Sequence, residues 1–327
     1  SGVYLWWQHH RALAANGRAD KAWAALQQAH ALLMDGVKNV RDEGLRRSYL
    51  NKVRVNQAVT QAWLHEAARR GLPDEQRLAH LRLPSDVREP FRRLVETGVR
   101  LNQIRSGAEL QEFLIDELLE LCGAERVLLV LEGDGGTFTL AGAQLPRDED
   151  HETGRAALLR AVTPWLEEAR LTQTTRLRHG PEGVPEVAQR SYIVAPLVVQ
   201  RDVLGYLYAD LEGAWGRFTS SDLDLMAALA AQAAVALANL RTQEGLERQV
   251  AERTAQLEHR AAELAVINSI QQALSAELDF QAISEAVGRK LAEVFGSDDL
   301  SILWWDEGAG LLHWLFAIEH GRRGNNP

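Results

Sequence analysis

One stretch decides the fold of this 327-residue chain: Ser191-Tyr-Ile-Val-Ala-Pro-Leu-Val-Val199, then Gln200-Arg-Asp202, then Val203-Leu-Gly-Tyr-Leu-Tyr-Ala209. Two apolar runs on either side of a short polar segment are typical of two antiparallel strands joined by a tight turn. Pro196 fits such a strand only where no ladder hydrogen bond is needed, because proline has no backbone N–H. We expect Gly205 to let a helix or a ligand approach the sheet closely, because glycine has no side chain. The hairpin predicts an antiparallel sheet.

Further strands are predicted before this hairpin. The apolar run at residues 126–131 indicates a buried strand, and a glycine turn at residues 133–136 leads to a second strand at residues 137–140. A possible short strand follows at residues 174–178. Strands joined by hairpins, with helices at both ends, predict an antiparallel α+β domain.

Helical periodicity surrounds these strands. It covers residues 91–104 and 110–121, and Gly123 is suited to end the second of these helices in a left-handed cap. Residues 148–171 are mostly helical, and we expect Pro164 to open a second short helix there. A last, long helix begins after Phe218, with Thr219 or Ser220 as its N-cap.

These elements resemble the GAF domain, a sensory module found widely in bacterial signalling proteins. The resemblance covers about residues 91–241. It rests on Ile193-Val-Ala-Pro-Leu197, Val203-Leu-Gly-Tyr-Leu207, Phe218-Thr-Ser-Ser-Asp222 and Leu229-Ala-Ala-Gln-Ala-Ala-Val-Ala-Leu-Ala-Asn239. We expect Phe218 to anchor the last helix. The resemblance implies a regulatory region of a multidomain protein, of the sensor histidine kinase or nucleotide cyclase type.

The last helix is predicted to continue from residue 223 to about residue 274, with residues 242–275 as a signalling helix or coiled coil. Apolar residues fall near heptad seam positions at Leu246, Val250, Leu257, Leu264, Ile267 and Leu274. Arg253 and Arg260 occupy two other seam positions, so the coil is imperfect. Residues 250–257 resemble the helices that join sensory modules to kinases and cyclases. We expect a parallel homodimer; a solvated connector helix is the alternative.

The flanking segments indicate further modules. Residues 1–70 are helical, and Gly17 to Ala29 resembles the second half of a tetratricopeptide repeat, with a generic helical hairpin as the alternative. Residues 71–90 contain three prolines and indicate a linker or an irregular docking segment. Residues 276–327 resemble the truncated start of a second GAF domain, in which we expect four aromatic side chains to lack cover: Trp304, Trp305, Trp314 and Phe316.

Composition narrows the possible partners and location. The net charge of −9 argues against nucleic-acid binding, which needs clustered Lys and Arg. We expect the clusters Arg46-Arg47 and Arg92-Arg93 to form solvated helix faces. No uninterrupted apolar run approaches the roughly 18 residues of a membrane span. The single cysteine, Cys122, excludes an internal disulfide and a multi-thiolate metal site, and favours a reducing, cytoplasmic location.

Motifs for catalysis are absent from the sequence, so we expect no enzymatic activity. There is no phosphate-binding glycine loop, nucleophile elbow or metal-binding helix motif. Cys122 ends a helix beside an apolar strand, which favours a buried structural thiol. His9, His10 and His259 are predicted to be surface residues of helices. A catalytic domain of the parent protein would lie outside this chain.

The resemblance also limits the classes of ligand that we expect. Bilin-binding relatives attach their chromophore through a cysteine in the later half of the domain, where this chain has none. Some cyclic-nucleotide-binding relatives carry an Asn-Lys pair that is missing from residues 211–217, and Leu223 replaces their Glu. No cofactor is identified, and no motif around His151 or His179 supports haem. The family pattern places a pocket between the sheet and residues 148–190.

Five residues of that region are the candidate ligand-binding residues: Trp165, Arg176, Arg178, His179 and Tyr192. The alternative is that Trp165 is a core residue and the arginines face solvent. The sequence predicts a sensory module that transmits small-molecule or partner binding through a dimeric linker helix to an output domain elsewhere. The second hypothesis is a protein-interaction or dimerisation scaffold whose GAF pocket is unoccupied.

Overall fold

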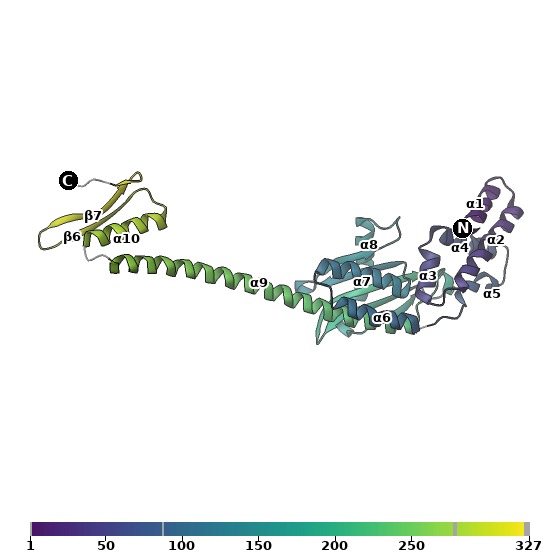
Figure 1. Cartoon of the computed structure of the whole chain (residues 1–327). Helices are drawn as coiled ribbons and strands as arrows, with labels where there is room; N and C mark the ends of the chain where they lie inside the picture. Colours follow the sequence, from purple (N-terminus) through teal and green to yellow (C-terminus); the bar gives the residue numbers. More distant parts are fainter. Residues whose placement is uncertain (1, 87, 277–279, 324–327) are drawn as a thin grey trace. The chain divides into compact units, whose positions relative to one another are not determined.

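The computed structural model describes residues 2–86, 88–276 and 280–323, and the chain divides into two compact units, Ser1–Gln243 and Glu244–Pro327. The first unit is built around a five-stranded antiparallel sheet of strand order β2-β1-β5-β4-β3 (Figure 1). Its strands are β1 (Arg126–Glu132), β2 (Phe138–Gln144), β3 (Arg176–Gly180), β4 (Arg190–Val199) and β5 (Asp202–Glu212). The predicted α+β class is confirmed.

The hairpin of β4 and β5 forms as predicted, with a turn at Gln200 and Arg201. Pro196 lies beyond Val194, the last β4 residue that pairs with β3, so no β3 residue faces it. The prediction for Gly205 was wrong about what approaches the sheet. A Cβ at Gly205 would lie 2.4 Å from the carbonyl oxygen of Val130, so it is strand β1 that needs the space, and neither a helix nor a ligand does.

Helices cover both faces of the sheet. Helices α6 (Arg88–Leu101), α7 (Gly107–Cys122) and the first part of α9 (Ser220–Ala276) share a hydrophobic core with Ile193, Ala195 and their neighbours on one face. Helix α8 (Glu152–Thr172) packs on the other face, over Val194, Tyr206 and Tyr208. The core therefore has two layers, one on each side of the sheet.

Helix α8 is continuous, which corrects the prediction that Pro164 opens a second helix. Proline removes one backbone hydrogen bond of a helix. Four apolar side chains of α8 are buried against the sheet, and their packing holds the helix together through that point: Leu158, Val162, Leu166 and Ala169.

The N-terminal segment is helical, as predicted. It comprises α1 (Gly2–Ala15), α2 (Ala19–Lys38), α3 (Glu43–Asn51) and α4 (Arg54–Arg69), followed by the short helix α5 (Asp74–Arg77) and a 3₁₀ turn (Ala79–Leu81). Gly17 separates α1 from α2 with a positive φ of 71°. The rings of Trp23 and His30 both stack on Trp63, which fixes α2 against α4.

Arg46 and Arg47 are buried, so the prediction that they form a solvated face was wrong. Their exposed fractions are 2% and 1%. Arg46 donates to the carbonyl oxygens of Leu83 and Pro84, in the segment that leads from the N-terminal helices to α6. A pair of arginines looks like a surface feature in sequence because its partners lie far away along the chain.

Arg47 binds Asp222 at the first turn of α9. Arg47 Nη1 and Nη2 donate to the two carboxylate oxygens of Asp222 at 2.7 and 3.1 Å. The same guanidinium donates to the carbonyl oxygens of Cys122 and Arg217, and lies over the ring of Phe218. Asp222 also accepts from the backbone N–H and the hydroxyl of Thr219, so Thr219 closes the N-terminus of α9.

Backbone contact reinforces this ion pair. A Cβ at Gly44 of α3 would fall 2.4 Å from the carbonyl oxygen of Leu121, and one at Gly123 would fall 2.1 Å from the carbonyl oxygen of Gly44. Asn51 donates to the carbonyl oxygen of Gly123 at 3.0 Å. Helix α3 therefore packs against the end of α7 at a distance that only glycine permits.

The second unit begins within α9, and its helix and strands follow one another in the order that the sequence predicted. Helix α10 (Phe280–Phe295) is followed by the antiparallel strands β6 (Leu300–Asp306), β7 (Leu311–Glu319) and β8 (Arg322–Arg323). Trp304, Trp305 and Trp314 are about half exposed, as predicted. Phe316 is buried, contrary to prediction, because its ring lies against Gly288 of α10.

One helix in the described part of the chain, Ser220–Gln272, is long and apolar enough to cross a membrane by length and composition alone. Half of its most apolar window is buried inside the protein, as in an ordinary core helix, so the evidence for a membrane span is weak.

Replacing Arg47 with Met leaves the carboxylate of Asp222 buried without its cation. We expect the free energy of unfolding of the first unit to fall by about 3–5 kcal/mol. The matched control is Arg69→Met, which breaks an ion pair with Glu66 at an exposed side chain and should cost less than about 1 kcal/mol. Urea denaturation followed by circular dichroism measures both, and equal losses would contradict the role given to Arg47.

Candidate functional site

A cavity of about 680 Å³ lies between α8 and the sheet. Its walls come from α8 and the loop before it, from strands β1, β4 and β5, and from the end of β3. The lining residues are Arg126, Glu149, Gly154, Ala157, Leu158, Ala161, Val162, Trp165, Gly180, Pro181, Arg190, Tyr192 and Tyr208. The cavity occupies the position that the sequence predicted for a ligand pocket.

Small residues on α8 leave this space open. Ala157 and Ala161 lie one helical turn apart and both line the cavity. Gly154 is fixed by the cap of the helix, because a Cβ there would lie 2.1 Å from the carbonyl oxygen of Glu149. The ring of His151 accepts from the backbone N–H of Gly154 at 3.0 Å and completes that cap.

Three aromatic rings form one wall. The ring of Trp165 stacks on that of Tyr192, with centroids 4.0 Å apart and planes 15° apart. The ring of Tyr208 lies 6.3 Å from Trp165 at 17°. Nearly parallel rings beside a cavity suit a flat apolar ligand.

A polar cluster adjoins these rings and is centred on Asp210, which is fully buried and pairs with Tyr192 across strands β4 and β5. Arg126 donates from Nη2 to Asp210 at 2.7 Å, and Arg190 donates from Nη1 at 2.7 Å. The hydroxyl of Tyr208 donates to the second oxygen of Asp210 at 2.6 Å. One buried carboxylate thus joins side chains of β1, β4 and β5.

Two further carboxylates complete the cluster. Arg190 Nη1 also donates to Glu125 at 2.8 Å, and Arg126 pairs with Glu149 at 3.4 Å. Burial disfavours the charge of both arginines, but attraction and hydrogen bonding from Asp210 raise the pKa of each. Burial raises the pKa of Glu125, and burial together with Asp210 raises that of Tyr208. The arginines stay charged and the tyrosine stays neutral at neutral pH.

The five predicted residues divide into three groups. Trp165 and Tyr192 line the cavity and stack on each other. Arg178 lies beside Tyr192 in the sheet and pairs with Glu168 at 2.5 Å, while Arg176 lies 3.8 Å from the same carboxylate, so both arginines are half-exposed and outside the cavity. Successive side chains of β3 point to alternate faces of the sheet, so His179 lies on the face opposite that of Arg178. There its Nδ1 lies 2.8 Å from Ser191 Oγ. Burial and then Arg217 lower the pKa of His179.

We did not predict the polar cluster around Asp210 from the sequence. Arg126, Arg190 and Asp210 stand at the ends of apolar strands, where a charged residue ordinarily marks the return to solvent. The available signal was the strand register. In an antiparallel sheet of this order, the start of β1 and the end of β5 are neighbours, as Arg126 and Asp210 are here.

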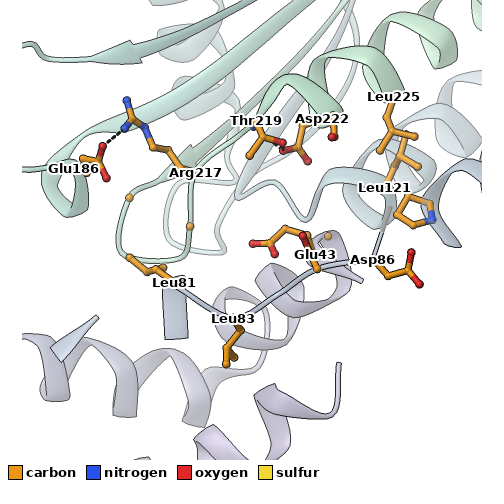
Figure 2. A pocket seen from close by; sticks show the side chains of 16 residues that line it. Glu43, Leu81, Leu83, Asp86, Leu121, Glu186, Arg217, Thr219, Asp222 and Leu225 are labelled. Carbon is orange, nitrogen blue, oxygen red and sulfur yellow. Dashed lines mark hydrogen bonds and ion pairs between the residues drawn. The ribbon is translucent and has the colours of Figure 1, made fainter. Parts of the chain in front are cut away.

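A second cavity, of about 310 Å³, lies where the N-terminal helices meet the start of α9. Figure 2 shows Thr219 and Asp222 on one side of it and Glu43 on another. Four of its five charged lining residues are in ion pairs: Asp222 with Arg47, Arg217 with Glu186, and Glu43 with Arg46. The fifth, Asp86, accepts from the backbone N–H of Arg88. Of these pairs, Arg47 with Asp222 joins the N-terminal helices to the sheet domain, and the pairing leaves little charge for a ligand.

A family model matches the sheet domain. It is the model of the GAF domain, and it matches residues 109–237. The GAF domain is a regulatory and not a catalytic module. Within residues 2–86, 88–276 and 280–323, no group of three His, Cys, Asp or Glu side chains could hold a metal ion. A comparison with curated proteins gave no match.

Several solved GAF structures are similar to part of the chain. GAF-B of DevS from Mycobacterium smegmatis is 22% identical, with 43% of this chain and 99% of that chain covered and a TM-score of 0.33. The GAF domain of a putative sensor histidine kinase from Pseudomonas syringae pv. tomato is 16% identical, with 49% and 93% covered and a TM-score of 0.35. That of a phosphoenolpyruvate-protein phosphotransferase from Coxiella burnetii is 16% identical, with 49% and 99% covered and a TM-score of 0.37.

Cys122 is buried, and its thiol donates to the carbonyl oxygen of Leu118 at 2.8 Å. Burial, with a further contribution from Asp222, raises the pKa of this thiol to about 12. At pH 8 the group is therefore a thiol, and it cannot act as a nucleophile. Iodoacetamide at pH 8 should leave the folded chain unlabelled and add one carbamidomethyl group in urea, as read by mass spectrometry. Full labelling of the folded chain would contradict this assignment.

Proposed function

We propose that this chain is a sensory module of signal transduction that binds a small molecule in the cavity between α8 and the sheet. The observation that carries the proposal is the cavity itself: it is bounded by aromatic rings, small α8 residues and one polar cluster. Its position in a GAF domain, a regulatory module, supports the same assignment. We further propose that the chain acts in the cytoplasm and has no catalytic activity of its own.

The signal would leave the domain through α9. This helix contributes Leu225, Met226 and Leu229 to the core of the sheet domain and continues without interruption to Ala276. Beyond the domain it presents an apolar stripe whose members are each at least half exposed: Leu246, Val250, Leu257, Leu264 and Ile267. Leu274 is the next seam position, but its side chain lies outside the described residues. Burial of this stripe in a parallel homodimer is part of the proposal.

Arg253 and Arg260 would allow the proposed dimer to change between two helix packings. Both sit at seam positions, where a charged side chain weakens packing. A weak seam can have two packings of similar free energy, and a ligand shifts such an equilibrium by its differential affinity for the two states. The output domain, a histidine kinase or a nucleotide cyclase, would lie outside this chain.

The flanking units are assigned by the same proposal. Helices α1 to α4 would be a tetratricopeptide-like segment docked on the GAF domain. The sequence of α10, β6 and β7 would be the start of a second GAF domain, because it repeats the order of α7, β1 and β2. The left-handed glycine after each helix, Gly123 and Gly296, supports that correspondence.

A protein-interaction scaffold with an unoccupied pocket is the second candidate. Exposed apolar side chains on α6 favour it, since Phe91, Val95 and Val99 recur at intervals of four residues with exposed fractions of 43%, 69% and 59%. Such a stripe suits a protein partner. The scaffold differs from the sensor in one measurable respect, because it retains no small molecule in the cavity.

Filling the cavity should remove the ligand without unfolding the domain. We expect wild-type protein and Ala156→Phe, an exposed α8 position outside the cavity, to carry the same small-molecule adduct in native mass spectrometry. Ala161→Phe should lose the adduct, because the ring occupies the space. If none of the three freshly purified proteins carries an adduct, the scaffold is favoured. If Ala161→Phe keeps the adduct, the ligand binds outside the cavity.

Charge on the stripe of α9 should dissociate the dimer. The double variant Val250→Glu/Leu257→Glu loses about 1.5–3 kcal/mol of burial per side chain, so the dimer dissociation constant should rise by at least about 100-fold. Arg253→Leu/Arg260→Leu should lower it. Sedimentation equilibrium measures these constants, with Ala255→Glu/Ala262→Glu as the control on the outer face of the helix. A wild-type chain that stays monomeric at high concentration would refute the dimer.

A further inference from the structure

The polar cluster at one end of the cavity has unused hydrogen-bond donors. Arg190 directs both donors of Nη1 to carboxylates, one to Glu125 and one to Asp210. Within the described part of the chain, its Nε and Nη2 groups make no hydrogen bond with protein. Because Arg190 lines the cavity, these donors are available to a bound molecule.

The buried acceptor of the cluster, Asp210, is occupied. Both oxygens of Asp210 accept hydrogen bonds, one from Arg190 and the other from Tyr208, and Arg126 contacts both. Glu125 accepts from Arg190 on one oxygen. A bound group that needs an acceptor, such as an ammonium, would find none free on Asp210, and Glu149, which also lines the cavity, is half exposed and pairs with Arg126 at 3.4 Å. The cluster is therefore suited to bind an acceptor of the ligand.

Charge decides what kind of acceptor fits. Two arginines, Arg126 and Arg190, face three carboxylates, those of Asp210, Glu125 and Glu149, so the cluster has no surplus positive charge. A carboxylate or phosphate would gain no net attraction there. It could bind Arg190 more tightly only by drawing it from Asp210, and weakening the pairing of a fully buried carboxylate is costly. An uncharged acceptor avoids that cost.

The rest of the cavity specifies the shape of the ligand. The planes of Tyr192 and Tyr208 lie within 17° of the plane of Trp165, and the other α8 residues that line the cavity are small or apolar: Gly154, Ala157, Leu158, Ala161 and Val162. A flat ring system fits beside such rings with its face in contact. The rings and the free donors of Arg190 together give the ligand a fixed orientation.

We propose that the cavity takes an uncharged, planar aromatic molecule with a carbonyl-type acceptor at one end, oriented by Arg190; this rests on the proposed function. The carbonyl oxygen accepts from Nε or Nη2 of Arg190, and the ring lies against Trp165, Tyr192 and Tyr208. Arg190 is thereby the residue that sets specificity. Asp210 acts through the arginines as a positioning residue.

Three probes with one ring system test the ligand class: 2-naphthamide, which is an uncharged carbonyl compound, 2-naphthoate, which is anionic, and 2-methylnaphthalene, which has no acceptor. Their dissociation constants for the full chain are measured by ligand-observed NMR titration. A hydrogen bond to a charged donor predicts that 2-naphthamide binds at least about tenfold more tightly than either of the others. Equal binding of the three, or tighter binding of 2-naphthoate, overturns the proposal.

Variants separate this proposal from the proposed function. Arg190→Met should remove the tenfold preference for 2-naphthamide and keep the binding of the ring, whereas Arg160→Met, on α8 outside the cavity, should keep the preference. Ala161→Phe should abolish binding of all three probes.

The outcomes distinguish the ligand class from the proposed function. Probes that bind without preference, and that no longer bind to Ala161→Phe, show that the cavity is a ligand site but refute the ligand class. Binding of no probe also refutes the class, while the purified adduct still decides the function. An unchanged preference in Arg190→Met refutes the role of Arg190.

Discussion

The buried ion pair of Arg47 and Asp222 joins three parts of the first unit that are far apart in sequence. Arg47 belongs to α3 of the N-terminal helices, it donates to the carbonyl oxygen that ends α7, and its carboxylate partner stands in the first turn of α9. A charge pair this deeply buried is costly unless hydrogen bonds compensate for the lost water. Here Nη1 and Nη2 of Arg47 are hydrogen-bonded, and its Nε lies 3.6 Å from Glu43 Oε1. The position of α3 and the start of α9 therefore depend on each other, and a force on the N-terminal helices acts directly on the helix proposed to carry the signal.

The sheet domain reaches α9 from a different side. Its cavity lies on the α8 face of the sheet, whereas α9 packs on the opposite face, so the two communicate through the strands between them. Strand β5 is central to this path, since alternate residues serve alternate faces. Tyr208 lines the cavity, and its neighbours Leu207 and Ala209 lie in the core that α9 shares. A ligand that shifts β5 would change both layers at once.

Much of the fold was predictable because its signals are local. Strand alternation, the glycine after α7 and the polar turn at Gln200 and Arg201 depend on a few neighbouring residues, and all were found where expected. The errors concern partners distant in sequence. Arg47 was predicted to be a surface residue because its partner, Asp222, lies 175 positions later in the sequence. Gly205 faces the backbone of Val130, and α8 passes Pro164 because the sheet supports it. Of the predicted ligand residues, the stacked pair Trp165 and Tyr192 meets at the cavity, whereas Asp210 and its arginines are joined only by strand register.

Hydrogen–deuterium exchange of the full chain measures whether the cavity and α9 are coupled. Exchange of peptides within residues 244–272 is compared with and without saturating 2-naphthamide, alongside peptides of α8 as a report of binding. If the cavity and α9 are coupled, protection changes in both regions when the cavity is filled. A change confined to α8 and the sheet, with α9 unaltered, would contradict this coupling.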